Sequence, residues 1–295
     1  MEVNNESTVR LDNLVRGLPV QSVRKIVSRA LVEDLGKGDL TTTLTVPETT
    51  KAHGTFFAKQ PLVVAGLPVA AEVFRMLEPD YAWGVVAADG AEVAAGEPLA
   101  RVEGKAATLL SGERVALNFL QRLSGIATLT RKFKQQLEGL KTELLDTRKT
   151  TPGLRILEKY AVRMGSGTSH RVGLDEGILI KNNHIAMAGG IGAAVGRVRS
   201  GRPAGMPIEV EVRTGTELEE AIEAGADIVL LDNMTPAEVA ECVRLAGGRV
   251  RLEVSGGVSL QNVRAYAQTG VDRISVGALT HSAPAADINF LIEPL

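Results

Sequence analysis

Short apolar runs alternate with amphipathic stretches throughout the C-terminal part of the chain. The runs IEVEV, DIVLLD, VRLEVS and DRISVG start at Ile208, Asp227, Val250 and Asp272. Starts separated by about 20 residues suit a strand followed by a helix and leave no room for hairpins alone. The pattern therefore predicts a series of strand–helix units.

Capping residues mark where the helices of this series begin and end. Thr235, followed by a proline, predicts one helix start, and Ser259 is a possible cap for the next helix. Gly225, Gly247 and Gly270 predict three helix ends. Repeated strand–helix units need a parallel sheet covered by helices, and right-handed crossovers curl such a sheet toward a barrel.

The stretch 41–104 has a different pattern, with short β-rich runs separated by Gly, Pro and Asp-Gly. This pattern is typical of an antiparallel sheet. Apolar residues at helical spacing precede it in 19–36 and follow it in 111–133, where Ser111 is a possible helix cap.

These differences predict two domains with a boundary at Ser111. We expect an N-terminal α+β sandwich domain over residues 1–110. Residues 111–280 are expected to form an open, incomplete α/β barrel of TIM type. The apolar tail 281–295 is expected to pack back on the first domain.

Composition narrows the class of protein. The chain has 295 residues, of which 44% are hydrophobic, and a net charge of −2, so a nucleic-acid partner is not expected. The start of the chain lacks a signal-peptide pattern, and no segment offers the roughly 20 apolar residues of a membrane span. We expect a cytoplasmic protein, in which the single cysteine, Cys242, is a buried thiol without a disulfide partner in the chain.

Carboxylates occupy alternate positions of the run 208–212. Because side chains alternate across a strand and covering helices bury the apolar face, we expect Glu209 and Glu211 to point into the barrel. Glu211 lies nearer the mouth, and Asp232 ends the next run, so the two carboxylates suit Mg²⁺ bound directly or through water. A structural ion pair for Glu211 and a helix N-cap for Asp232 are the alternatives. Glu209 is expected deeper, paired with a buried cation.

Glycine loops follow the last two runs. Glycine at a strand-to-helix turn lets backbone N–H groups approach an oxyanion, and the following helix adds its positive end. Two such loops at corresponding positions predict a phosphate site. The loops consist of Ser255, Gly256 and Gly257, and of Val276, Gly277 and Ala278.

Basic residues gather between the strands expected at 142–146 and near Lys181. They lie in Gly/Ser/Thr-rich loops rather than at helical spacing, which favours an anion site over a solvated basic face. Arginine matches a carboxylate or phosphate bidentately, whereas lysine is a point charge, so we expect anions of different shapes. The sequence favours neither of two partners for His170, which are a carboxylate and a loop carbonyl. The residues are Thr147, Arg148, Lys149, His170, Arg171 and Lys181.

Long strings in these regions resemble the quinolinate phosphoribosyltransferase family. They are DTRKTTPGLR, GSGTSHRVGLDEGILIKNNHIA, EVEV, LLDNM, EVSGGV and SVGALTHS. The likeness extends from Glu33 to Ser282 and is least distinctive between Lys51 and Gly104. It implies a transferase of NAD biosynthesis that converts quinolinate and phosphoribosyl pyrophosphate to nicotinate mononucleotide, pyrophosphate and CO₂ with magnesium.

The resemblance also implies roles for individual residues in a homodimer. Lys149, Lys181, Glu211 and Asp232 are the implied catalytic residues, with the two lysines near phosphoribosyl pyrophosphate and the two carboxylates around its magnesium pyrophosphate. The glycine loops are implied to surround the 5-phosphate. Quinolinate would be bound by Arg148, His170, Arg171 and Lys181, together with Arg114 reaching in from a partner subunit.

Three other functions remain open. A related protein of the molybdenum-transport-associated type would keep the scaffold and act on another anionic ring. A barrel lyase would use Lys181 as a Schiff-base nucleophile, which requires an apolar pocket. A carrier-type β module would carry a modified Lys105 near its turn.

Overall fold

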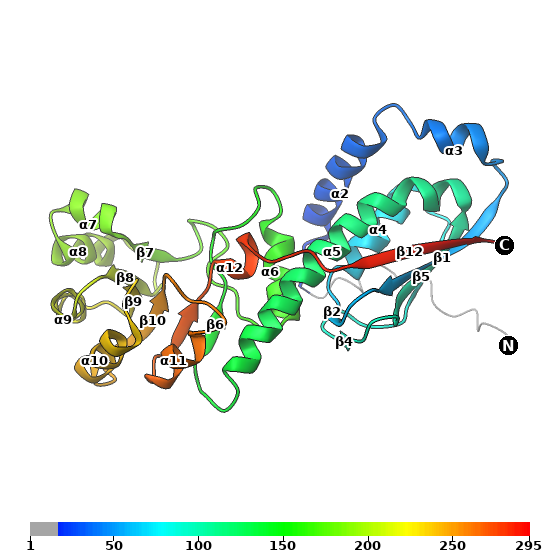
Figure 1. Ribbon diagram of the computed structural model, residues 1–295. Coiled ribbons are helices and arrows are strands. Elements are labelled where there is room, and N and C mark those ends of the chain that lie inside the picture. The colour runs from blue at the N-terminus through cyan, green and yellow to red at the C-terminus, as the bar shows by residue number, and fades with distance from the viewer. Residues whose placement is uncertain (1–16) are drawn as a thin grey trace. The chain divides into compact units, whose positions relative to one another are not determined.

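The computed structural model describes residues 17–295, which form two compact units (Figure 1). The described part of unit 1 comprises 17–131, 151–166 and 282–295, and unit 2 comprises 132–150 and 167–281. The start of the chain, where we expect no signal peptide, falls in residues 1–16 and lies outside the described residues. Unit 1 extends past the predicted boundary at Ser111, and one continuous helix, α5 (Ala106–Gln136), passes through this residue, so Ser111 is not a helix cap.

A four-stranded antiparallel sheet with the order β12-β1-β5-β3 organises unit 1. The C-terminal tail contributes β12, which pairs with β1 from Ala52↔Pro294 to Ala58↔Ile288. The antiparallel pattern predicted for 41–104 is thus confirmed. The strands are β1 (Lys51–Ala58), β3 (Ala82–Val85), β5 (Pro98–Lys105) and β12 (Ile288–Pro294), and a separate pair is formed by β2 (Leu62–Val63) and β4 (Glu92–Val93).

Helix α4 (Leu67–Leu77) was not predicted from the sequence. All its residues from Leu67 to Phe74 are buried, so its apolar positions do not follow the helical period of a half-exposed helix. Helix α2, in contrast, buries only one face, and its prediction is confirmed. The other helices of unit 1 are α2 (Val20–Leu35), α3 (Leu40–Thr45), α5 and α6 (Arg155–Met164).

Aromatic rings form the centre of unit 1. Phe56 on β1 stacks on Phe290 of β12 with ring centroids 4.2 Å apart, and both contact Phe74 of α4. Gly54 leaves room for this packing, since a Cβ there would lie 2.1 Å from the Phe290 ring. Lys105 ends β5 immediately before α5 begins at Ala106, so it does not occupy the hairpin turn of a carrier module.

A six-stranded parallel sheet with the order β6-β11-β10-β9-β8-β7 forms unit 2. Strands β6 and β7 lie at its two edges, so the barrel is open, as predicted. A single parallel bridge from Leu145 to Thr168 extends the β6 edge. The strands are β6 (Glu143–Leu145), β7 (Ile178–Ile180), β8 (Ile208–Val212), β9 (Ile228–Asp232), β10 (Arg251–Ser255) and β11 (Arg273–Ser275).

Helices cover the outer face of this sheet (Figure 1), with α8 and α9 packed on β8 and α11 on β11. Thr235 caps α10 by accepting the N–H of Glu238, and Gly225 and Gly247 end helices in the left-handed conformation, as predicted. Ser259 does not cap α11, which begins after Asn262. The helices are α7 (Asn182–Ala188), α8 (Ile191–Gly201), α9 (Gly215–Ala224), α10 (Pro236–Ala246), α11 (Val263–Gln268) and α12 (Ala278–His281).

The single cysteine is buried, as expected from its apolar surroundings. Cys242 lies on α10, and its thiol is 3.7 Å from the sulfur of Met234. Among the helices of residues 17–295, none has the length and the hydrophobicity needed to cross a membrane.

Candidate active site

The carboxyl ends of the unit 2 strands carry most of the predicted site residues. Asp146 directly follows β6, and Lys181 directly follows β7. Glu211 is the penultimate residue of β8, Asp232 ends β9 and Ser255 ends β10. Parallel strands bring these ends to one edge of the sheet, which is where an α/β barrel places its chemistry.

The alternation in β8 is confirmed. Its apolar residues face the covering helices, whereas Glu209 and Glu211 meet polar partners on the inner side. Both carboxylates are more than 90% buried. A buried carboxylate needs compensation by a cation or by hydrogen bonds, so the partners of each glutamate define what it does.

Glu211 pairs with Lys181. The Nζ atom of Lys181 lies 2.8 Å from Oε2 of Glu211, and the lysine side chain is about half exposed. The backbone N–H of Lys181 donates to Nδ1 of His184, which fixes the start of α7. A carboxylate at this distance is contrary to the apolar pocket that a Schiff-base lysine requires. The ion pair expected as an alternative for Glu211 is therefore present.

Asp232 has a cationic neighbour that sequence reasoning missed. Nε of Arg213 lies 3.4 Å from Oδ2 of Asp232, and the side-chain amide of Asn233 donates to Oδ1. The expected alternative, Asp232 as a helix N-cap, is wrong because Thr235 caps α10. Arg213 directly follows β8, and this position at a strand end was the available signal.

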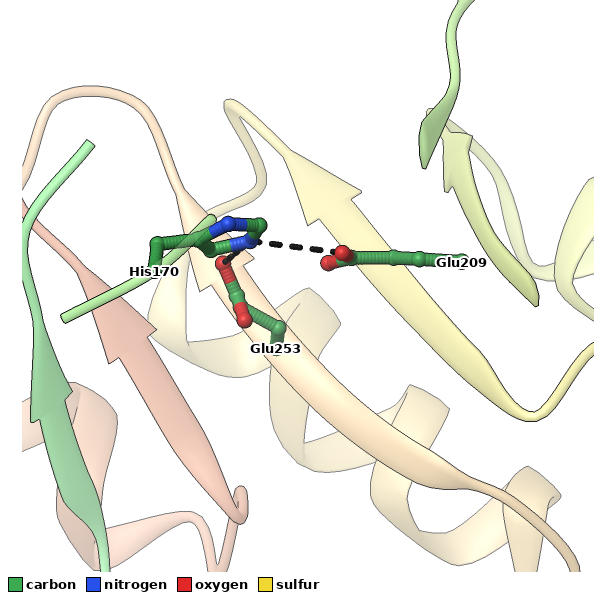
Figure 2. A group of neighbouring side chains, drawn as sticks. All are labelled: His170, Glu209 and Glu253. Carbon is green, nitrogen blue, oxygen red and sulfur yellow. Dashed lines mark ion pairs between the residues drawn. The ribbon is translucent and has the colours of Figure 1, made fainter. Parts of the chain in front are cut away.

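His170 lies between two buried glutamates (Figure 2). Its Nε2 is 3.3 Å from Oε2 of Glu209 and 3.6 Å from Oε1 of Glu253. The predicted pairing of Glu209 with a buried cation is only half correct, since His170 is a cation only when protonated and the third member is another carboxylate. Burial in the barrel, and then the charge of Glu209, raise the pKa of Glu253 to about 7.

Arg148 and Arg171 form the arginine side of the site. Burial, and secondly the charge of Arg148, lower the pKa of the Arg171 guanidinium, which nevertheless stays charged at neutral pH. Nη1 of Arg171 donates to the carbonyl of Gly177, and the N–H of His170 donates to Asp146. The charge of Glu209 acts on the pKa of Arg171 in the opposite direction. The planar forks of two neighbouring guanidinium groups match carboxylate or phosphate groups.

Lys149 lies beside the second glycine loop. A Cβ on Gly277 would be 2.9 Å from Cδ of Lys149 and 3.2 Å from the ring of His281. The hydroxyl of Thr280 donates to the Lys149 carbonyl, and the N–H of Lys149 donates to Thr147. The structure thus brings a lysine, a histidine and a glycine turn together, and His281 was not predicted.

The first glycine loop differs from the expectation in one respect. Gly256 and Gly257 adopt positive φ angles of 91° and 65°, which favour glycine. A Cβ on Gly256 would lie 2.2 Å from Oδ1 of Asn233, so the loop packs against the end of β9. However, α11 starts only at Val263 and α12 has four residues, so neither loop leads directly into a long helix whose positive end could bind phosphate.

Arg114 is the predicted site residue that belongs to unit 1. It is exposed on α5, well inside the helix that starts at Ala106. Asp146 and Glu253, in contrast, are site residues of unit 2 that sequence reasoning missed. The signal for Glu253 was the same alternation as in β8, because Leu252 and Val254 flank it in the run RLEVS.

The donor atoms of Glu211 and Asp232 fit magnesium. Both are carboxylates on the hydrogen-bonded neighbours β8 and β9, and hard oxygen donors are what Mg²⁺ prefers. The cluster of His170, Glu209 and Glu253 has three possible ligand atoms within 4.8 Å of one another, but its histidine makes it a poorer match for this ion.

Two family models cover most of the chain. The N-terminal domain of quinolinate phosphoribosyl transferase matches residues 39–124, and the C-terminal domain matches residues 126–291. The probable nicotinate-nucleotide pyrophosphorylase [carboxylating] of Bacillus subtilis is 43% identical over 267 residues, which are 90% of this chain and 92% of the relative. The corresponding protein of Mycobacterium leprae is 41% identical over 90% of this chain and 96% of its own length.

Solved structures agree with the fold. The nicotinate-nucleotide pyrophosphorylase from Ehrlichia chaffeensis has a TM-score of 0.87 at 41% identity and covers 91% of this chain and 98% of its own. The enzyme of the same name from Francisella tularensis has a TM-score of 0.88 at 38% identity, covering 94% and 98%.

Proposed function

We propose, since this chain belongs to the quinolinate phosphoribosyltransferase family, that it transfers the phosphoribosyl group of phosphoribosyl pyrophosphate to quinolinate. The products are nicotinate mononucleotide, pyrophosphate and CO₂, in de novo NAD biosynthesis. One observation carries the assignment of the site. The positive charges of the site form two groups. Arg148 lies near Arg171, whereas Lys149 lies against the glycine turn at Gly277.

The arginine side suits a dicarboxylate ring. Arg148 and Arg171 offer planar forks that match carboxylates, and Lys181 adds a point charge. His170 belongs to the same side, although both its ring nitrogens face protein groups. Arg114, supplied by a partner subunit of a homodimer, would complete the clamp.

The lysine side suits phosphate groups. Lys149 and the turn Val276–Ala278 would bind the 5-phosphate region together with Thr147 and the loop Ser255–Gly257. Glu211 and Asp232 would hold Mg²⁺ by their carboxylate oxygens, and this ion supplies charge neutralisation to the pyrophosphate when it is bound.

Catalysis then depends mainly on orientation and electrostatics. The ring nitrogen of quinolinate attacks the anomeric carbon while pyrophosphate leaves, through a transition state with oxocarbenium character. Lys149 and Lys181 stabilise the negative charge that develops on the leaving group. The quaternised nitrogen then stabilises the carbanion that loss of CO₂ leaves at carbon 2. This carbon takes up a proton from water to give nicotinate mononucleotide, so no protein base is required for this step.

Assembly and location complete the proposal. The clamp needs a second copy of the chain if Arg114 acts from a partner subunit. Neither nucleic acid nor a membrane is expected as a partner, and the reaction is proposed to take place in the cytoplasm.

A product assay tests this function. The purified protein is incubated with quinolinate, phosphoribosyl pyrophosphate and magnesium, and nicotinate mononucleotide is measured by chromatography. We expect product with quinolinate and almost none when nicotinate replaces it, because nicotinate lacks the second carboxylate. Equal turnover of nicotinate would contradict the dicarboxylate clamp. Product formed only from another anionic ring would favour a protein of the molybdenum-transport-associated type.

A further inference from the structure

The two ring nitrogens of His170 have opposite partners. Nδ1 accepts a hydrogen bond from the backbone N–H of Arg171 at 2.8 Å. A ring nitrogen that accepts this bond carries no proton, so in the neutral imidazole the proton is on Nε2. The geometry therefore assigns the Nε2–H tautomer to His170.

The Nε2–H group points at the two carboxylates inside the barrel (Figure 2). Glu209 lies on β8 and Glu253 on β10, and their oxygens are 3.3 Å and 3.6 Å from Nε2. Glu253 is fully buried and Glu209 is 5% exposed. Within residues 17–295, neither carboxylate forms an ion pair with a lysine or an arginine. Two carboxylates, whose burial is unfavourable, thus face the single Nε2–H group of His170.

A metal site is the obvious competing explanation. Three ligand atoms within 4.8 Å of one another would suit a divalent cation such as zinc. A metal on Nε2, however, requires the proton on Nδ1, where the Arg171 N–H already points. Metal binding would place two donors against each other, so the Arg171 contact argues against it.

The same contacts connect the barrel interior to the arginine side of the site. Asp146 accepts the N–H of His170, and Nδ1 of His170 accepts the N–H of Arg171. Arg171 in turn donates to the carbonyl of Gly177. The backbone that carries Arg171 is therefore bonded to the imidazole ring, and the other nitrogen of the ring faces the two glutamates.

We propose that Glu209 and Glu253 are positioning residues that hold His170 by its Nε2–H and thereby set the orientation of Arg171 for the quinolinate carboxylates. This inference rests on the proposed function. It gives His170, whose two ring nitrogens both face protein groups, a part in supporting the clamp.

Nuclear magnetic resonance tests the first part on the unaltered protein. Long-range ¹H–¹⁵N spectra distinguish the two imidazole tautomers, and the chain has only four histidines to assign, with a His170→Gln variant identifying the signal. We expect the Nε2–H tautomer at neutral pH and no bound metal in the purified protein. An Nδ1–H tautomer, or one equivalent of zinc lost in a Glu253→Ala variant, would overturn the proposal.

Steady-state kinetics test the second part. In Glu253→Ala, we expect KM for quinolinate to rise by about tenfold or more, with KM for phosphoribosyl pyrophosphate within about twofold of the parent. Glu253→Gln should restore a KM close to the parent value, because glutamine keeps the size of the side chain and an oxygen that can face Nε2–H. Glu72→Gln is the matched control, since Glu72 is equally buried but pairs with Arg75 in unit 1.

The outcomes separate this inference from the proposed function. Equal increases in both KM values, or an unchanged quinolinate KM in a folded Glu253→Ala protein, would contradict the positioning role. If Glu253→Ala does not fold, the tautomer in the parent and the kinetics of Glu253→Gln still decide. A parent protein that makes no product from quinolinate while showing the Nε2–H tautomer would reject the function and leave the contacts of His170 established.

Discussion

Replacing Glu253 by glutamine should change how the stability of the protein depends on pH. Burial first, and then the charge of Glu209, raise the pKa of Glu253 from 4.5 to about 7, while interactions with His170, Ser275 and Arg273 act in the opposite direction. The folded state therefore holds this proton more tightly than the unfolded chain. Its contribution to stability is fully present below pH 4.5 and is lost as the pH rises through about 7.

The size of the effect follows from the shift. Each pKa unit corresponds to roughly 1.4 kcal/mol, so the shift of Glu253 from 4.5 to about 7 corresponds to about 3 kcal/mol of unfolding free energy lost between acidic pH and pH 8. Glutamine resembles the protonated carboxyl group and does not ionise. The Glu253→Gln variant should therefore gain about 3 kcal/mol over the parent between about pH 4.5 and pH 8.

Urea unfolding at pH 5 and pH 8 measures this difference. Far-ultraviolet circular dichroism is the suitable signal, because the only tryptophan, Trp83, belongs to unit 1 and does not report on the barrel. Glu223→Gln, at an exposed position of α9, is the control. A stability difference between Glu253→Gln and the parent that is the same at both pH values would show that Glu253 does not titrate between them.

Three further predictions concern the site. Arg148→Ala and Arg171→Ala should each lose roughly 2 to 4 kcal/mol of transition-state stabilisation, measured as kcat/KM for quinolinate, and near-parental values in both would reject the carboxylate clamp. Gly277→Ala should raise KM for phosphoribosyl pyrophosphate by roughly tenfold, because its Cβ would lie 2.9 Å from Cδ of Lys149. An unchanged KM would show that this turn does not bind the phosphate. Chelation with EDTA should abolish turnover and added Mg²⁺ restore it, whereas full activity in EDTA would exclude the magnesium assignment.

Alternation along single strands was the most reliable guide to the site. In β8 it correctly separated the helix-facing residues from Glu209 and Glu211, because one face of that strand meets helices and the other meets polar groups. The same argument applied to β10 would have identified Glu253. The strand ends were also predictable, since an open parallel sheet brings them together whatever the loops do.

What the sequence did not reveal depends on contacts between distant segments. Helix α4 is buried on most sides, so its apolar run has no helical period to detect. The cap predicted at Ser111 is wrong because α5 continues through this residue. His281 became a site candidate only when the fold placed it beside Gly277.

The fate of one carboxylate of the substrate distinguishes the proposed reaction from other reactions of the same anions. Quinolinate labelled with ¹³C in the carboxyl group at carbon 2 is incubated with the protein, phosphoribosyl pyrophosphate and Mg²⁺, and CO₂ and nucleotide are analysed by mass spectrometry. We expect one labelled CO₂ for each unlabelled nicotinate mononucleotide. Label retained in the nucleotide, or no nucleotide at all, would contradict the proposed reaction.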